Sequence, residues 1–190
     1  MPENPLNDDE RKVLLDIARQ SLERAVRQQR LPKLDMTLMP PSLLYDGASF
    51  VTLTINGELR GCIGALEAYQ PLALDVQEHA VAAALDDYRF PPVRESELQK
   101  IHIEISRLTP PERLEYKDPE DLLELLKPGI DGVILMDGRQ RATFLPQVWD
   151  KVPSKISFLN QLCMKMGAAP DTWRKKHLEV LIYQVEEFHE

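Results

Sequence analysis

The segment ASFVTLTINGELRGCIG, residues 48–64, carries the clearest fold signal in the chain. β-Branched and aromatic residues are frequent over positions 48–55, which is typical of a strand. Asn56-Gly57 follows, and this dipeptide is a strong signal for a tight turn between antiparallel strands. We therefore predict a β-hairpin over residues 48–64.

The two faces of this hairpin depend on its register. With a strict two-residue turn, Leu53 lies opposite Arg60 and Val51 opposite Cys62, which mixes apolar and polar side chains on each face. A slip of one residue moves a whole set of side chains to the other face. A bulge, for which Gly61 is suited, would place the apolar side chains on one face and the polar side chains on the other. The expected apolar face holds Val51, Leu53, Ile55, Leu59 and Ile63, and the expected polar face holds Thr52, Thr54, Arg60 and Cys62.

Periodicity and capping residues predict the other elements. A first helix begins after Asn7, with Glu10 completing a capping box. A final strand over 177–186 has apolar residues on both faces, which predicts a position inside a sheet. Two hairpins in a non-alternating order of helices and strands predict an α+β fold, a largely antiparallel sheet flanked by helices, with room for a smaller appended subdomain. The remaining elements are helices at about 71–86, 119–127 and 154–166, a strand at 100–108 and a second hairpin at 131–145.

Composition excludes several classes of protein. The length of 190 residues predicts a single domain over 1–190. A net charge of -8 argues against binding to nucleic acid, which needs a basic surface. No apolar run is long enough to predict a membrane helix, and the N-terminal residues lack the apolar core of a signal peptide. We expect a cytoplasmic protein with neither nucleic acid nor membrane as a partner.

The two cysteines, Cys62 and Cys163, are expected to be free thiols. The chain has no CxxC or HxxxH pair, so no metal site is predicted, and no cofactor is assigned. Cys163 lies in an apolar helical stripe, which predicts a core position. Cys62 follows Arg60, and a nearby guanidinium favours the thiolate form of a cysteine. Gly61 and Gly64 would let a ligand approach the backbone.

Cys62 is therefore the candidate catalytic residue, and the simpler alternative is that it is a small buried apolar residue. Asp87 and Arg89 lie where a helix ends in a proline-fixed turn. Arg89 could bind a carboxylate or phosphate of a ligand, or it could pin the turn together with Asp87. Gln147 could orient a ligand or brace its own loop.

His102 and Glu104 alternate along the polar face of their strand. They could activate Cys62 if that strand is the neighbour of residues 58–64, and the alternative is an ordinary polar surface. His79, between Glu78 and Ala80 on a helix, is expected to be exposed.

LRGCIG, residues 59–64, resembles the signature of the AMMECR-type domain family. DDYRFPPV, residues 86–93, is similar to the family's Asp-Pro-Arg-Phe-Pro-Pro segment, with Tyr88 where a proline is usual. Four further segments match in kind and order, so the resemblance covers residues 45–175. They are IEIS at 103–106, GIDGVIL at 129–135, TFLPQVW at 143–149 and FLNQLCMKMG at 158–167.

The resemblance implies an α+β fold with a larger and a smaller part, and it implies no named reaction. Family members commonly accompany a Memo-like protein and a radical-SAM protein in a set called AmmeMemoRadiSam, which implies these two as partners. Two hypotheses follow. In the first, Cys62 processes a small or peptide-like substrate, with Arg60 and Arg89 holding anions. In the second, the hairpin face docks one of the partners without catalysis.

Overall fold

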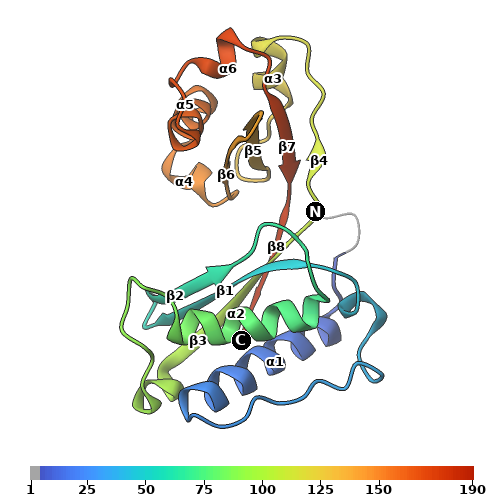
Figure 1. Cartoon of the computed structure of the whole chain (residues 1–190), viewed down its shortest axis with the longest axis vertical. Coiled ribbons are helices and arrows are strands. Elements are labelled where there is room, and N and C mark those ends of the chain that lie inside the picture. Colours follow the sequence, from blue (N-terminus) through green and yellow to red (C-terminus); the bar gives the residue numbers. More distant parts are fainter. Residues whose placement is uncertain (1–4) are drawn as a thin grey trace. The chain divides into compact units, whose positions relative to one another are not determined.

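The computed structural model describes residues 5–190, which fold into two compact units (Figure 1). The first unit runs to Leu108 and also includes Glu186–Glu190, while Thr109–Val185 form the second unit. Each unit contains helices and one four-stranded sheet, in which the strand pairs of known register are antiparallel. The predicted α+β class is therefore confirmed. None of the described helices is long and apolar enough to cross a membrane.

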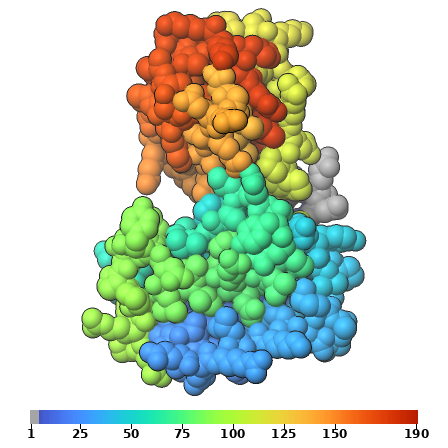
Figure 2. Space-filling view, in the orientation of Figure 1, coloured from blue at the N-terminus to red at the C-terminus, as the bar shows by residue number. Residues whose placement is uncertain are grey.

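The first unit is a four-stranded sheet with two long helices packed on one face. Its elements are α1 (Asp8–Val26), η1 (Pro41–Leu43), β1 (Ala48–Ile55), β2 (Glu58–Gly64), α2 (Leu72–Leu85), η2 (Glu95–Lys100), β3 (Ile101–Leu108) and β8 (Val185–His189). The strand order is β2-β1-β3-β8. Val51, Leu53, Ile103 and Ile105 are buried in one core with the apolar residues of α1 and α2. Figure 2 shows the helix-covered side, where the surface of α2 lies beside that of α1.

Local sequence explains how α1 begins. Asn7 Oδ1 accepts a hydrogen bond from the Glu10 amide at 2.9 Å, and Glu10 Oε2 accepts one from the Asn7 amide at 2.8 Å. The predicted capping box is thus confirmed, and it satisfies two amides that the first turn of α1 cannot pair. The helix predicted at about 71–86 is α2, which begins after Pro71 and ends at Leu85.

The structure confirms the bulge in the hairpin and corrects its position. Asn56 and Gly57, both at positive φ, form a two-residue turn, and the register of the strands shifts between Leu53 and Thr54. The unpaired residue is Arg60 rather than Gly61, because Thr54 pairs with Leu59 and Leu53 pairs with Gly61.

The position of the bulge changes the face of one predicted residue. Leu59 lies on the same face as Thr54, where it is 44% exposed, so its assignment to the apolar face was wrong. Val51 and Ile63 do pair on the apolar face, and Thr52 pairs with Cys62 on the polar face.

The second unit packs its helices with a sheet of order β4-β7-β5-β6. Its elements are β4 (Glu112–Arg113), α3 (Pro119–Leu125), β5 (Gly132–Asp137), β6 (Gln140–Phe144), α4 (Val148–Lys151), α5 (Lys155–Met166), α6 (Thr172–Lys175) and β7 (Glu179–Tyr183). Trp149 stacks on Phe158 with ring centroids 3.6 Å apart. Cys163 is fully buried in this core, as predicted.

The predicted last strand, 177–186, is two strands. Residue Gln184 separates β7 from β8, and these strands belong to different sheets. β7 lies between β4 and β5, so the interior position predicted from its apolar faces is confirmed for that part.

Candidate functional site

Cys62 lies on the face of the first sheet that is turned away from the helices. Side chains alternate along a strand, so the neighbours of the buried core residues emerge on this opposite face. Thr52 is the centre of it, because it pairs with Cys62 on β2 and with Glu104 on β3. We call this surface the polar face of the sheet; it holds Thr52, Thr54, Cys62, His102 and Glu104.

The Cys62 thiol is half-buried and has a hydrogen-bond donor beside it. The Thr52 hydroxyl donates to Sγ of Cys62 at 3.3 Å. The pair therefore combines a thiol that solvent reaches with a hydroxyl that fixes the position of its sulfur.

The backbone of Cys62 is fixed by the side chains of Asp87 and Arg89. β2 is an edge strand, and the Cys62 amide donates to Asp87 Oδ2 at 2.8 Å. Nη2 of Arg89 donates to the Cys62 carbonyl at 3.1 Å. A carboxylate and a guanidinium thus take the place of a neighbouring strand at this point of the edge. We call Asp87 and Arg89 the edge clamp.

The edge clamp is held together by a two-point ion pair. Arg89 Nε donates to Asp87 Oδ1 at 2.9 Å and Nη2 donates to Oδ2 at 2.7 Å. The hydrogen bond from Arg89 lowers the pKa of the Asp87 carboxyl far below its usual range, and Asp87 in turn raises the pKa of Arg89. Both groups therefore stay charged at any ordinary pH.

Arg60 is also paired with a carboxylate. Its Nε donates to Glu97 Oε1 at 2.8 Å, and Nη2 donates to the Pro91 carbonyl at 2.9 Å. The bond from Arg60 is the main reason that the pKa of Glu97 is lowered. The structure therefore gives the arginines of both segments a role in holding the edge of the sheet, and their assignment as anion holders stays a prediction.

Both glycines of the hairpin have a packing role. A Cβ added to Gly61 would lie 2.1 Å from the carbonyl oxygen of Ala83, and one added to Gly64 would lie 2.4 Å from the carbonyl oxygen of Ser49. Only glycine fits such close approaches. Gly61 thus lets β2 touch the backbone of α2, and the predicted approach of a ligand to these glycines stays a prediction.

Gln147 belongs to the second unit, where it precedes α4. The first unit brings together Arg60, Gly61, Cys62, Gly64, Asp87 and Arg89, and the role predicted for Gln147 stays a prediction.

The condition set for activation of Cys62 by His102 and Glu104 is not met, because β1 lies between β2 and β3. The backbones of β2 and β3 are two strand spacings apart, roughly 9.6 Å, so neither residue is a cross-strand neighbour of Cys62. Burial raises the pKa of Glu104, with a further rise from Glu187 and an opposing effect of His189.

The structure also shows a buried cluster that the sequence did not reveal. His79 is 5% exposed, so the prediction of an exposed side chain was wrong. Its Nδ1 lies 3.2 Å from Oδ2 of Asp75, which also accepts a hydrogen bond from the Ser49 hydroxyl at 2.6 Å. The signal available in the sequence was the spacing of four between Asp75 and His79, which places both on one face of α2.

Metal-binding geometry is absent from the described part of the chain. Among residues 5–190, no group of three or more His, Cys, Asp or Glu side chains is placed to hold a metal ion. The side chains gathered at the site are a thiol, a hydroxyl, carboxylates and guanidinium groups.

The fold and the LRGCIG hairpin define a family, and comparison with known proteins identifies it. The sequence profile of the AMMECR1 family matches residues 15–188, and the chain belongs to this family. A protein of Methanothermobacter thermautotrophicus is 40% identical over 191 residues, which cover 98% of this chain and 97% of that protein. A protein of Thermococcus onnurineus is 38% identical over 195 residues, covering 97% of this chain and 92% of the relative.

A solved structure supports the same assignment. The crystal structure of the uncharacterized protein PH0010 from Pyrococcus horikoshii superposes with a TM-score of 0.84 at 32% sequence identity. The superposition covers 97% of this chain and 93% of that protein. The family resemblance expected from LRGCIG and the segments that follow it is thus confirmed.

Proposed function

We propose that this protein binds and covalently processes a small or peptide-like substrate on the polar face of the first sheet, with Cys62 as the reactive group. One observation carries the proposal. The Cys62 thiol accepts a hydrogen bond from Thr52, while the edge clamp holds the amide and the carbonyl of the same residue. A thiol whose backbone is fixed on both sides is oriented without further cost when a substrate arrives.

The substrate class follows from the surface around Cys62. The polar face offers hydroxyls at Thr52 and Thr54 and a half-buried carboxylate at Glu104, all on adjacent strands. Such groups bind amides and other neutral polar groups by hydrogen bonds. We place this activity in the cytoplasm, where free thiols persist, and within the AmmeMemoRadiSam set, beside a Memo-like protein and a radical-SAM protein.

Replacing Thr52 with valine tests the proposal at its central contact. The variant keeps the shape of the side chain and removes the donor to Cys62. A hydrogen bond that stabilises the attacking sulfur by about 0.7 kcal/mol raises its rate of reaction about threefold. We therefore expect iodoacetamide to modify Cys62 about threefold more slowly in the variant, as measured by peptide mass spectrometry of the folded protein.

Thr54→Val is the matched control, since Thr54 lies on the same face and pairs with Leu59 instead of Cys62. The control should leave the rate unchanged. Equal rates in wild type, Thr52→Val and Thr54→Val would mean that the hydroxyl does not tune the thiol, and the proposed role of Cys62 would lose its support.

A second candidate function is a non-catalytic docking module for one of the two partner proteins. It is favoured by the pairing of Arg60 with Glu97 and of Arg89 with Asp87, which leaves these guanidinium groups occupied. We would mix the purified protein with each partner and measure co-elution for the wild type and for His102→Glu, a change on the exposed part of the polar face. Docking there predicts co-elution that the variant weakens, whereas Cys62→Ser should bind normally.

A further inference from the structure

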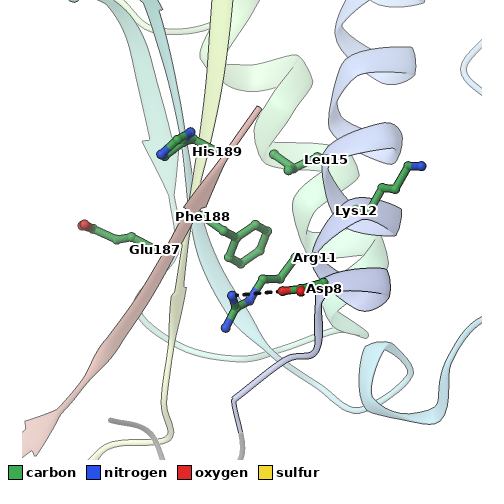
Figure 3. Close-up of a pocket in the computed structure, with 7 residues that line it drawn as sticks. All are labelled: Asp8, Arg11, Lys12, Leu15, Glu187, Phe188 and His189. Atoms are coloured by element: carbon green, nitrogen blue, oxygen red, sulfur yellow. Dashed lines mark ion pairs between the residues drawn. The ribbon is translucent and has the colours of Figure 1, made fainter.

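β8 forms one of the two edges of the first sheet and lies next to a pocket. β8 ends the strand order, so one side of its backbone has no neighbouring strand among the described residues. A pocket of about 400 Å³ lies between this strand and the N-terminal half of α1 (Figure 3). It is lined by Asp8, Arg11, Lys12, Leu15, Glu187, Phe188 and His189.

Two residues of β8 direct their backbone groups toward the free edge. The Glu190 amide donates to the Ile103 carbonyl at 3.2 Å, so position 190 faces β3. Backbone groups alternate along a strand, so Glu187 and His189 face away from β3, while Phe188 faces it. An open row of amides and carbonyls of this kind is a template for another strand.

The side chains of β8 also sort by face. Phe188 belongs to the buried core and points toward α1 and Leu15, whereas Glu187 and His189 point to the opposite side (Figure 3). Glu187 and His189 therefore extend the polar face beyond Glu104. Their effects on the pKa of the Glu104 carboxyl agree with this placement.

We propose that β8 pairs with β8 of a second copy of this chain, antiparallel and about a two-fold axis at Phe188. In this register Glu187 lies opposite the partner's His189, and His189 lies opposite the partner's Glu187. These are the outward-facing residues, so each pair exchanges two backbone hydrogen bonds. Each of the two cross-strand pairs then places a carboxylate beside an imidazole. This complementarity favours a second copy of the chain as the partner of β8.

In this dimer the pocket of each copy lies at the interface, next to the two-fold axis. The residue on the axis belongs to a non-hydrogen-bonded pair, where facing side chains come closest. Phe188 and Leu15 line the pocket on the core side of the strand, so the two pockets adjoin across the axis and their apolar walls bury one another. The result is one eight-stranded sheet whose polar face is continuous across both copies. This interface does not depend on the chemistry of Cys62.

A charge exchange tests the interface in the full chain by sedimentation equilibrium. The wild type is expected to be a dimer. Glu187→Lys places lysine opposite histidine, and His189→Glu places two glutamates opposite each other, so each single variant should weaken dimerisation about tenfold. The double variant, which pairs lysine with glutamate, should restore it. A wild type that stays monomeric at high concentration, or a double variant that fails to recover, would overturn the proposal.

Cross-linking tests the register independently of the affinity. Chains carrying Glu187→Cys and chains carrying His189→Cys, both with Cys62→Ser, are mixed under mild oxidation. Paired positions have Cα atoms about 5.5 Å apart, which suits a disulfide. The mixture should form a cross-linked dimer and neither variant alone should do so. Cross-linking of one variant with itself, or none in the mixture, would contradict the register.

Discussion

Gly61→Ala is expected to lower the free energy of unfolding of the first unit by about 3 kcal/mol, because the new methyl group has no room. The added Cβ would lie 2.1 Å from the carbonyl oxygen of Ala83, and the next nearest atoms also belong to the backbone of Ala83. A flexible side chain could move aside, but a helix backbone moves only if the packing of α2 on the sheet is disturbed. Urea unfolding followed by far-ultraviolet circular dichroism measures the loss.

Gly57→Asn is the matched control in the same hairpin. Gly57 has a positive φ of 81° and nothing lies within 4 Å of an added Cβ. Asparagine tolerates this backbone conformation, so the control should cost less than about 1 kcal/mol. Similar stabilities for Gly61→Ala and Gly57→Asn would show that β2 and α2 are not in backbone contact.

Asp87→Asn is expected to lower the free energy of unfolding by about 2 to 3 kcal/mol at neutral pH. The amide cannot replace a carboxylate that accepts from the Cys62 amide, the Arg89 amide and the Arg89 guanidinium. Removing one partner of a buried pair costs about 3 to 5 kcal/mol, and the Arg89 side chain is 43% exposed, which reduces that cost. Asp86→Asn, the exposed neighbour, should change stability by less than about 0.5 kcal/mol.

The effect of Asp87→Asn also depends on pH in a defined direction. The pKa of Asp87 is lowered in the folded protein, so its stabilising contribution is complete above the pKa of the unfolded chain, about 4. That contribution is lost as the pH falls below this value. The difference between wild type and variant should therefore be constant from pH 8 to pH 5 and narrow below pH 4. A difference that grows in acid would contradict the charged clamp.

The hairpin shows how far the sequence determines this fold. The requirement that apolar residues share a face predicts a bulge, and the structure contains one. Its position is wrong by one residue, because the bulge forms at Arg60, whose side chain pairs with Glu97, while Gly61 is needed against Ala83. Both reasons are contacts with distant segments, and the pattern of the hairpin alone carries no information about them.

The candidate site was predictable in its residues and less so in its arrangement. The turn at Asp87 and Arg89 is recognisable in the sequence, which leaves pinning of the turn and ligand binding as alternatives, but its contact with the backbone of Cys62 depends on tertiary structure. The periodicity of apolar residues does not indicate the order of strands in a sheet. The position of β1 between β2 and β3 therefore could not be predicted. The buried position of His79 depends on Asp75, whose carboxylate lies within hydrogen-bond distance of the imidazole in the core.

The measurement that tests the role of Cys62 most directly is the rate at which each cysteine is alkylated in the folded protein. Cys62 is half-buried beside Thr52, whereas Cys163 is fully buried and burial raises the pKa of its thiol. We expect iodoacetamide to modify Cys62 at least about 100-fold faster than Cys163, at a rate independent of unfolding. Modification of both residues only as the protein unfolds would show that Cys62 is a packed residue and would contradict its role as the reactive group.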